Sequence, residues 1–364
     1  MKIAGATHAD NNFDAVRVLA AAAVIFGHAH PLSGQPDLGV LGNATGTLAV
    51  KIFFIISGYL VAQSWARDPS PIRYLSKRCL RIFPALLWVL LLTVFVLGPL
   101  FTTVGLSTYF SDPGTWRYFG FNLALYPDYH LPGVFAQNVY PAAVNGSLWS
   151  LPVEFAMYLL FPVVYAATRV TRSNRLLVVF TIAFCAASLY WVRIAKPDAP
   201  VVLYGTSLTY ALDVGPYFFL GAVYAVTRLH RLLDPVFALF AIGLVAFFQP
   251  DGAMASEVVL FVLAPYCVLA FANASTPVLR GAGRHGDLSY GLYLYGFPVQ
   301  QALFSVFGPT MTPAQNTICA LAIAALFAYV SWHLVEKRAL ALKPLSPSRR
   351  LAIPSAPTIS DSRC

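Results

Sequence analysis

The fold class of this chain follows from residues 13–32, which read FDAVRVLAAAAVIFGHAHPL. An apolar helix of about 20 residues is long enough to cross the roughly 30 Å hydrocarbon core of a bilayer. Asp14 and Arg17 stand near the start of the stretch, and no small-residue cleavage pattern follows it. The stretch therefore predicts a membrane span and differs from a cleaved signal peptide.

The rest of the chain repeats this apolar character. Of the 364 residues 58% are hydrophobic and 11% charged, which excludes a soluble globular enzyme and a disordered protein, since soluble domains carry about 25% charged residues. We expect an all-α integral membrane protein with about ten transmembrane helices. The nine further predicted spans are 46–66, 82–102, 149–168, 176–193, 204–227, 232–249, 256–273, 288–307 and 315–335.

Basic residues set the expected orientation. The chain has 24 Lys and Arg against 15 Asp and Glu, and a formal net charge of +9. All but four of the basic residues fall on one side of the ten-span arrangement; the exceptions are Lys51, Arg117, Arg193 and Lys196. By the positive-inside rule both termini are predicted to be cytoplasmic, and the basic excess orients loops and does not indicate nucleic-acid binding.

The segments between and after the predicted spans indicate a single membrane domain followed by a short tail. Residues 1–345 are expected to form a single transmembrane domain, and the Ser- and Pro-rich segment 346–364 a disordered cytoplasmic tail. The outer connection 103–148 is long enough to be either functional or disordered. Five scattered cysteines without metal-like spacing are interpreted as packing thiols, with no disulfide framework and no metal site.

Ionisable residues in the first span need an explanation, because each costs about 2.5–3.5 kcal/mol at the centre of a membrane helix. Arg17 and His28 are eleven residues apart, which puts them on one helix face about 16 Å apart. Asp14 is one turn from Arg17 and in reach of it. The alternative is that Asp14 and Arg17 form an interfacial pair and that His28 is a hydrogen-bonded histidine near the outer boundary.

A carboxylate is expected at the depth of His28. Ser150 and Glu154 share a face at the start of the span 149–168, which enters from the outer side. A carboxylate beside an imidazole favours general-base chemistry, because the acid holds the tautomer and stabilises the imidazolium. The alternative is that Glu154 hydrogen-bonds the kinked helix start near Pro152.

Three other motifs stand out, and two of them have two interpretations each. Arg78 and Arg81 are one turn apart and predict an anion site for phosphate groups, or serve only to orient the chain. Ser57-Gly58 within the second span favours close helix packing. The stretch SYGLYLYGFP, residues 289–298, indicates a broken, cavity-lining helix, or a set of interfacial aromatic residues.

Taken in order, these motifs resemble acyltransferase family 3, the ten-span membrane O-acyltransferases that modify bacterial polysaccharides and some small molecules. The matching elements are Arg17 with His28 for Arg-x10-His, 53–58 for FFxxSG, 78–81 for RxxR, 149–154 for WSLxxE, 290–294 within SYxLYL, and 335–337 for VEK. The family often has a histidine after SYxLYL, where this chain reads Tyr295-Gly296-Phe297-Pro298. Longer relatives add an esterase-like domain, so here transfer is expected in the membrane domain or with a separate protein.

The resemblance implies an O-acyltransferase of the bacterial cytoplasmic (inner) membrane, expected to be an O-acetyltransferase. It implies cytoplasmic acetyl-CoA or another acyl-CoA as donor substrate, no permanently bound cofactor, and a hydroxyl of a cell-envelope, exported or lipid-linked saccharide as acceptor. The expected roles are catalysis by His28 as general base or acyl carrier with Glu154 and Arg17, donor binding by Arg78, Arg81 and Arg17, and substrate binding by Ser150, Tyr290 and Tyr293.

Two rival functions remain at this point. A transporter or flippase of a lipid-linked sugar also buries charges and uses broken helices, although no paired repeats are visible in the sequence. An acyltransferase acting on a small lipophilic molecule differs only in its acceptor.

Overall fold

The chain is all-α and spans a membrane several times. The computed structural model describes residues 11–141, 143–171 and 173–344, and 77% of it is helical. The predicted tail 346–364 and the first ten residues lie outside the described residues, so the expected cytoplasmic position of both termini stays a prediction.

A long helix lies at each of the ten predicted spans. They are α1 (Phe13–Leu32), α2 (Thr45–Arg67), α3 (Pro71–Leu92), α7 (Ser150–Thr171), α8 (Arg175–Leu189), α9 (Leu208–Val226), α10 (Pro235–Phe248), α11 (Gly252–Asn273), α12 (Ser289–Phe307) and α13 (Pro313–Ser331). In the described part of the chain, seven helices are long and apolar enough to cross a membrane, and α9, α10 and α12 are not among them. The count of ten spans therefore stays a prediction.

Short elements extend and connect these helices. The π-helical segments are η2 (Thr93–Leu97), η4 (Tyr190–Ala195) and η8 (Trp332–Glu336), and α4 (Gly98–Phe101) and α14 (Lys337–Ala341) continue α3 and α13. The 3-10 turns are η3 (Gly146–Trp149), η5 (Arg228–Leu232), η6 (Leu279–His285) and η7 (Gly308–Thr310). Two antiparallel two-residue hairpins, β1 (Gly39–Val40) with β2 (Asn43–Ala44) and β3 (Val202–Leu203) with β4 (Thr206–Ser207), precede α2 and α9.

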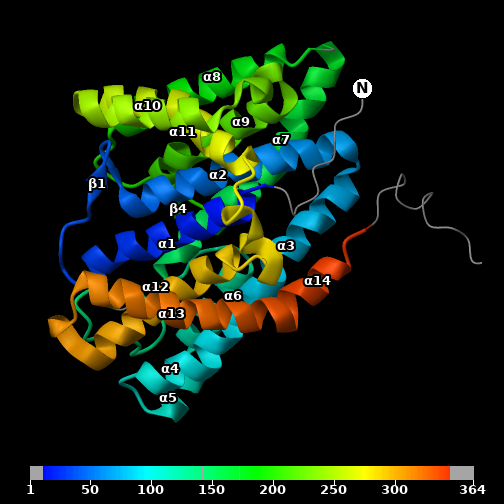
Figure 1. The fold of residues 1–364 in the computed structure, drawn as a ribbon. Helices are drawn as coiled ribbons and strands as arrows, with labels where there is room; N and C mark the ends of the chain where they lie inside the picture. The colour runs from blue at the N-terminus through cyan, green and yellow to red at the C-terminus, as the bar shows by residue number, and fades with distance from the viewer. Residues whose placement is uncertain (1–10, 142, 172, 345–364) are drawn as a thin grey trace, which may run out of the picture.

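Two ends of the helix bundle are distinguished below. The basic end is where α1 and α3 begin and α2 ends, at the right of Figure 1; the opposite end is where α1 ends and α2 begins, beside β1. The third helix begins at Pro71 and not at the predicted residue 82. The reason is that its basic first turns are amphipathic and start with a proline, which is favourable in the first turn of a helix.

The long connection at the opposite end is ordered. It contains α5 (Leu106–Ser111) and α6 (Pro113–Leu123), and the Asp112 side chain caps α6 by accepting from Gly114 N. Tyr109 and Tyr118 of these helices are fully buried. The interpretation of 103–148 as disordered is therefore wrong. The cysteines that the structure describes are free thiols, as expected.

Glycines bring α2 against α9. A Cβ atom added to Gly58 would overlap the backbone oxygen of Phe218, and one added to Gly221 would overlap that of Ile55. Each helix thus touches the backbone of the other through a glycine, which is the close packing that Ser57-Gly58 predicts. Figure 1 shows α2 in the middle of the bundle, between α1 and α9.

The helix α12 is continuous, so the prediction of a broken helix is wrong. Pro298 lies inside it and cannot donate a hydrogen bond to the carbonyl of Leu294. The side-chain amide of Asn145 donates to that carbonyl instead, at 2.9 Å. Gly291 packs against Ala328, and Gly296 against Ile25. The glycines therefore serve packing, and Asn145 replaces the donor that the proline lacks.

Candidate active site

A large cavity enters the bundle from the basic end. Its volume is about 1640 Å³, and its lining extends from Arg231 and Lys343 at the mouth to Ser150 and Tyr293 inside. The predicted site residues on its wall are Arg17, Arg78, Arg81, Ser150, Glu154, Tyr290 and Tyr293. The structure therefore brings together every predicted site residue except His28, which is not part of this lining.

Two of the predicted arginines share one carboxylate. Nη1 of Arg17 and Nη2 of Arg81 each lie 2.7 Å from Oδ2 of Asp287. Asp287 also accepts from the backbone N and hydroxyl of Ser289 at the start of α12. Burial alone would raise the pKa of Asp287, but the two guanidinium groups hold that pKa well below its usual range. The expected pair of Asp14 and Arg17 also forms, at 3.8 Å.

The third arginine, Arg78, has no carboxylate partner in the part of the chain that the structure describes. The Arg78 guanidinium lies over the rings of Tyr74 and Tyr158, at 5.9 and 5.6 Å from their centroids. Its Nε is buried, and among the described residues no group accepts a hydrogen bond from it. A buried cation on a cavity wall without an anion is well placed to bind an anionic ligand.

The whole cavity wall is cationic. Its Lys and Arg residues are Arg17, Arg67, Lys77, Arg78, Arg81, Arg228, Arg231 and Lys343, against the acids Asp14, Asp68, Glu154 and Asp287. Partial burial, followed by the charges of Arg78, Arg81 and Arg17, lowers the pKa of Lys343 to about 8. An anion in the cavity would relieve the repulsion that this lowered pKa reflects.

Glu154 lies on the cavity wall but not beside His28. Ser57 donates a hydrogen bond to its Oε1 at 2.9 Å, and the Tyr158 hydroxyl donates to the same atom. In the described part of the chain, Nδ1 of His28 is buried without a hydrogen-bond partner. The expectation that Glu154 orients His28 is therefore not met, because the helix α7 turns this carboxylate towards α2 and its own next turn.

Ser150 and Tyr293 meet at the inner limit of the cavity. Their hydroxyl oxygens are 2.6 Å apart, and the Tyr293 hydroxyl also lies 2.8 Å from the Ser147 carbonyl oxygen. A tyrosine has one hydroxyl hydrogen, so Tyr293 donates to Ser147 and Ser150 donates to Tyr293. Both hydrogens are used, and polarising a substrate carbonyl would require one of these bonds to break.

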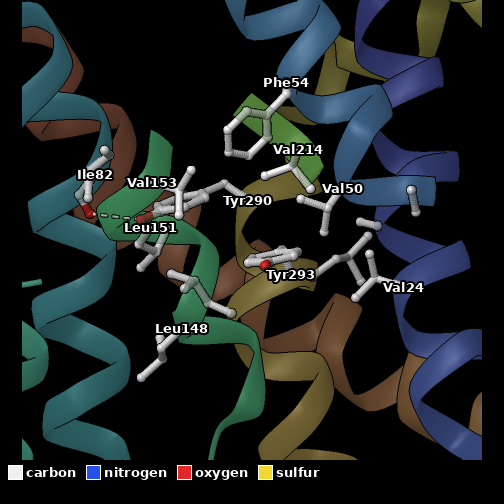
Figure 2. Packing of buried hydrophobic residues seen from close by; sticks show 14 of the residues in the cluster. Val24, Val50, Phe54, Ile82, Leu148, Leu151, Val153, Val214, Tyr290 and Tyr293 are labelled. Carbon is white, nitrogen blue, oxygen red and sulfur yellow. Dashed lines mark hydrogen bonds between the residues drawn. The ribbon is translucent and has the colours of Figure 1, made fainter. Parts of the chain in front are cut away.

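Tyr290 and Tyr293 project from neighbouring turns of α12. Figure 2 shows the Tyr290 hydroxyl donating to the carbonyl of Ile82 on α3, at 3.2 Å. The same view shows Tyr293 on the side of Val50 and Val24, with which it shares one buried apolar cluster. The two tyrosines thus form part of the inner cavity wall, and Tyr293 meets apolar packing beyond it.

His28 lies on α1 closer to the opposite end. It is half-buried, and the edge of its ring meets Phe297 with centroids 5.2 Å apart. Gly46, at the start of α2, leaves room beside it, since a Cβ there would lie 3.8 Å from Nε2 of His28. A residue of the segment 295–298, where the family often has a histidine, is thus in contact with the predicted catalytic histidine.

A second charged cluster lies near the opposite end. Nζ of Lys51, which is fully buried, lies 2.8 Å from Oε1 of Glu257 and 3.0 Å from Oδ1 of Asp213. Arg193 lies 2.6 Å from Oε2 of Glu257. The members of this cluster, called the closed network below, are Asn43, Lys51, Arg193, Asp213, Tyr217 and Glu257.

Sequence reasoning missed Asp287 and the closed network. The signal for Asp287 was an acidic residue two positions before the SYxLYL stretch. The signal for the network was that Lys51 and Arg193 are two of the few basic residues on the less basic side. In both cases the charged partner is more than a hundred residues away in the sequence. The acids that pair with Arg193 are the exception, because they lie closer to it in the sequence.

Comparison with known proteins gives a consistent result. A sequence model of an acyltransferase domain matches residues 10–334. The O-acetyl transferase of Shigella phage Sf6 is 30% identical over 92% of this chain and 97% of its own length. Nodulation protein 10 of Rhizobium leguminosarum bv. viciae is 30% identical over 94% of this chain and 96% of its own length.

A more distant relative and the solved structures complete the comparison. The peptidoglycan O-acetyltransferase OatA of Listeria monocytogenes is 23% identical over 89% of this chain, which covers 55% of that protein. No solved structure matches. Since the family match covers nearly the whole chain and two relatives reach 30% identity, this protein belongs to acyltransferase family 3 and is a multi-pass membrane O-acyltransferase.

Proposed function

We propose that the protein is an O-acetyltransferase of the bacterial inner membrane that takes its acyl group from acyl-CoA on the cytoplasmic side and gives it to a saccharide hydroxyl at the opposite end. The observation that carries this proposal is the cationic cavity wall with the unpartnered Arg78. Coenzyme A is polyanionic and has a long flexible arm, which suits a deep cavity whose mouth is basic. Two of the relatives carry O-acetyltransferase names, which supports an acetyl group.

The donor enters from the basic end. Its phosphates bind Arg78, Arg81 and Lys343, and they compete with Asp287 for Arg81, which shares that carboxylate with Arg17. The arm then follows the wall past Glu154 and Tyr290 and brings the thioester to the inner limit of the cavity at Ser150 and Tyr293. Glu154 with Ser57 and Tyr158 provides a polar wall along this route.

The transfer step needs a base on the acceptor side, and His28 is the proposed base. It takes the proton from the acceptor hydroxyl, whose oxygen attacks the thioester carbonyl. The carbon–sulfur bond breaks, and the thiolate leaves and receives the proton from the imidazolium, so protons and charge balance. In the variant of this mechanism with an acyl carrier, His28 itself receives the acyl group before the hydroxyl does.

The test uses inverted membrane vesicles, in which the proposed cytoplasmic face is outside. Radiolabelled acetyl-CoA is added, and label is counted in extracted polysaccharide and lipid-linked sugar. We expect label with the wild type and a loss of about a hundredfold or more with His28→Ala. The matched control is His30→Ala, because His30 lies on the same helix with its Nδ1 on the Phe26 carbonyl.

Each outcome decides something. Loss of label with His28→Ala but not with His30→Ala supports both acetyl-CoA as donor and the role of His28. Equal label in the wild type and His28→Ala contradicts the role of His28 but keeps the donor. No label above that of vesicles without the protein contradicts acetyl-CoA as donor and favours a transporter or another donor.

A further inference from the structure

A second set of cations lines the cavity mouth, apart from Arg17, Arg78 and Arg81. Arg67 ends α2, and Arg228 and Arg231 lie on η5, the turn that follows α9. All three line the cavity and are exposed at its rim. They are called the rim arginines below.

The turn that carries two of the rim arginines is held in place. The Thr227 hydroxyl accepts from Leu229 N at 3.3 Å, and Nδ1 of His230 lies 2.6 Å from the Thr227 carbonyl oxygen. The side-chain amide of Asn174, before α8, donates to the Val226 carbonyl at 2.8 Å. These bonds fix η5 against the start of α8, so Arg228 and Arg231 project from a defined turn.

Among the residues that the structure describes, the rim arginines have no carboxylate partner. Arg67 donates to the amide oxygen of Gln63 at 2.9 Å, and within the described ranges none of the rim arginines forms an ion pair. Asp68, an acid at the cavity mouth, forms ion pairs with Arg73 and Lys77. These two cations hold the pKa of Asp68 well below its usual range. The rim therefore presents positive charge that no described residue of the chain neutralises.

The rim arginines and the inner arginines come from different walls. Arg17 and Arg81 belong to α1 and α3, whereas the rim arginines belong to the end of α2 and the turn after α9. The inner set is continuous with the route inward, because Arg81 lies over the Tyr290 ring and Arg78 over the Tyr158 ring. The cavity thus has two separate cationic positions, one at its rim and one at the start of its inner passage.

Coenzyme A has two separate anionic groups. Its pyrophosphate carries the flexible arm, and a phosphomonoester sits on the ribose at the far end of the nucleotide. The group that carries the arm must lie where the passage begins, which leaves the ribose phosphate for the rim. We propose that the rim arginines bind the ribose phosphomonoester, so that the enzyme selects CoA thioesters over dephospho-CoA thioesters. This inference rests on the proposed acyl-CoA donor.

The test compares acetyl-CoA with acetyl-dephospho-CoA, which lacks only that phosphate. We expect the wild type to use the dephospho donor with kcat/KM lower by about tenfold to a hundredfold, the typical value of charge-assisted hydrogen bonds. In the double variant Arg228→Ala/Arg231→Ala, which keeps only Arg67 at the rim, kcat/KM for acetyl-CoA should fall most of the way to the value for the dephospho donor, which itself stays unchanged. Arg78→Ala should lower kcat/KM for both donors by the same factor.

The matched control is Arg175→Ala/Arg280→Ala. These arginines are exposed at the same end of the bundle but do not line the cavity, so their loss should leave the donor ratio unchanged. If the basic turn only orients the chain in the membrane, both double variants behave alike. Equal use of the two donors by the wild type, or an unchanged ratio in Arg228→Ala/Arg231→Ala, would overturn the inference.

Calorimetric binding to the purified full chain separates this inference from the proposed function. CoA and dephospho-CoA are titrated into the wild type and both double variants. If neither donor supports transfer, the result counts against the proposed function. If neither nucleotide binds, both proposals are overturned. Binding that prefers CoA by about tenfold or more in the wild type, and not in Arg228→Ala/Arg231→Ala, supports the rim site on its own.

Discussion

The closed network near the opposite end and the cationic cavity at the basic end use buried charge in contrasting ways. In the closed network two cations, Lys51 and Arg193, face two acids, Asp213 and Glu257, at 2.6 to 4.0 Å. Along the cavity wall eight Lys and Arg face four Asp and Glu. Charges that are balanced internally serve the fold, whereas an unbalanced surplus is available to a ligand.

The closed network joins parts of the chain that are far apart. Asn43 beside the first hairpin, Lys51 of α2, Asp213 of α9 and Glu257 of α11 meet there. Because Asn43 precedes the start of α2 that packs beside His28, the network also holds the surroundings of the proposed base. Its loss should therefore affect folding first and activity only through folding.

The largest expected effect is on stability, from breaking the closed network. Glu257→Gln leaves Lys51 and Arg193 with less buried negative charge, so we expect the free energy of unfolding to fall by about 3–5 kcal/mol. Thermal unfolding in detergent measures it. The double variant Lys51→Met/Glu257→Gln should lose less than the sum of the single variants.

A surface ion pair provides the control for this prediction. Arg117 and Asp128 lie 2.8 Å apart, with the arginine side chain 56% exposed. Arg117→Ala should cost about 0–1 kcal/mol. If Glu257→Gln lowers the free energy of unfolding by a similarly small amount, the network contributes no more than a surface pair. The contrast between the closed network and the cationic cavity would then be wrong.

Arg78→Ala tests the cavity side of the contrast. Since Arg78 has no acid to leave unpaired, stability should change little, while KM for acetyl-CoA rises by about tenfold to a hundredfold. Kinetics in vesicles and thermal unfolding of the same preparation measure the two effects. Marked unfolding with an unchanged KM would instead assign Arg78 to the fold.

Asp287→Asn should make the cavity more cationic still. Arg17 and Arg81 lose the carboxylate that they share at 2.7 Å. We expect the free energy of unfolding to fall by about 1–3 kcal/mol, because two guanidinium groups lose their partner. The KM for acetyl-CoA should fall at the same time, since both arginines become available to phosphate. A raised KM would show that Asp287 is needed to aim the arginines.

The smallest expected effect is a pH dependence from Lys343. Its lowered pKa of about 8 means that its positive charge is present below pH 8 and is lost as the pH rises through that value. The KM for acetyl-CoA should therefore rise by about two- to fivefold between pH 7 and 9, as expected for one exposed ion pair. The donor phosphomonoester, with a pKa of about 6, is already ionised over this range.

Lys343→Arg is the control variant for the pH series. Arginine stays charged throughout the range, so its KM should remain flat. A wild type whose KM is also flat, or an arginine variant whose KM rises just as steeply, would remove Lys343 from donor binding.

The residue types of the site could be predicted from the sequence, but their pairing could not. Arg17 and Glu154 stand out because charges are costly within apolar helices, and Arg81 because it is one turn from Arg78; the structure places all three on the cavity wall. Their depth follows from counting residues along each helix. The rotation of each helix about its axis does not follow, because it depends on packing against helices far away in the sequence. Glu154 therefore meets Ser57 and Tyr158, and not His28.

Local signals failed where a distant side chain overrode them. Pro298 favours a break in α12, yet the amide of Asn145 satisfies the carbonyl of Leu294 and the helix continues. Asp287 is one acid before a tyrosine-rich stretch, and its role appears only when α1 and α3 cross beside it. Close packing at Gly58, by contrast, was predictable, because it depends on the lack of a side chain at that position alone.

The inner limit of the cavity has a consequence for the membrane itself. The described lining ends at Ser150 and Tyr293 and includes no residue of the connections 33–44 or 103–148. Among the described residues, this cavity therefore stops short of the connections at the opposite end. A solute that fills it stays in exchange with one face of the bilayer, and its acyl group has to leave it past the side chains of Ser150 and Tyr293.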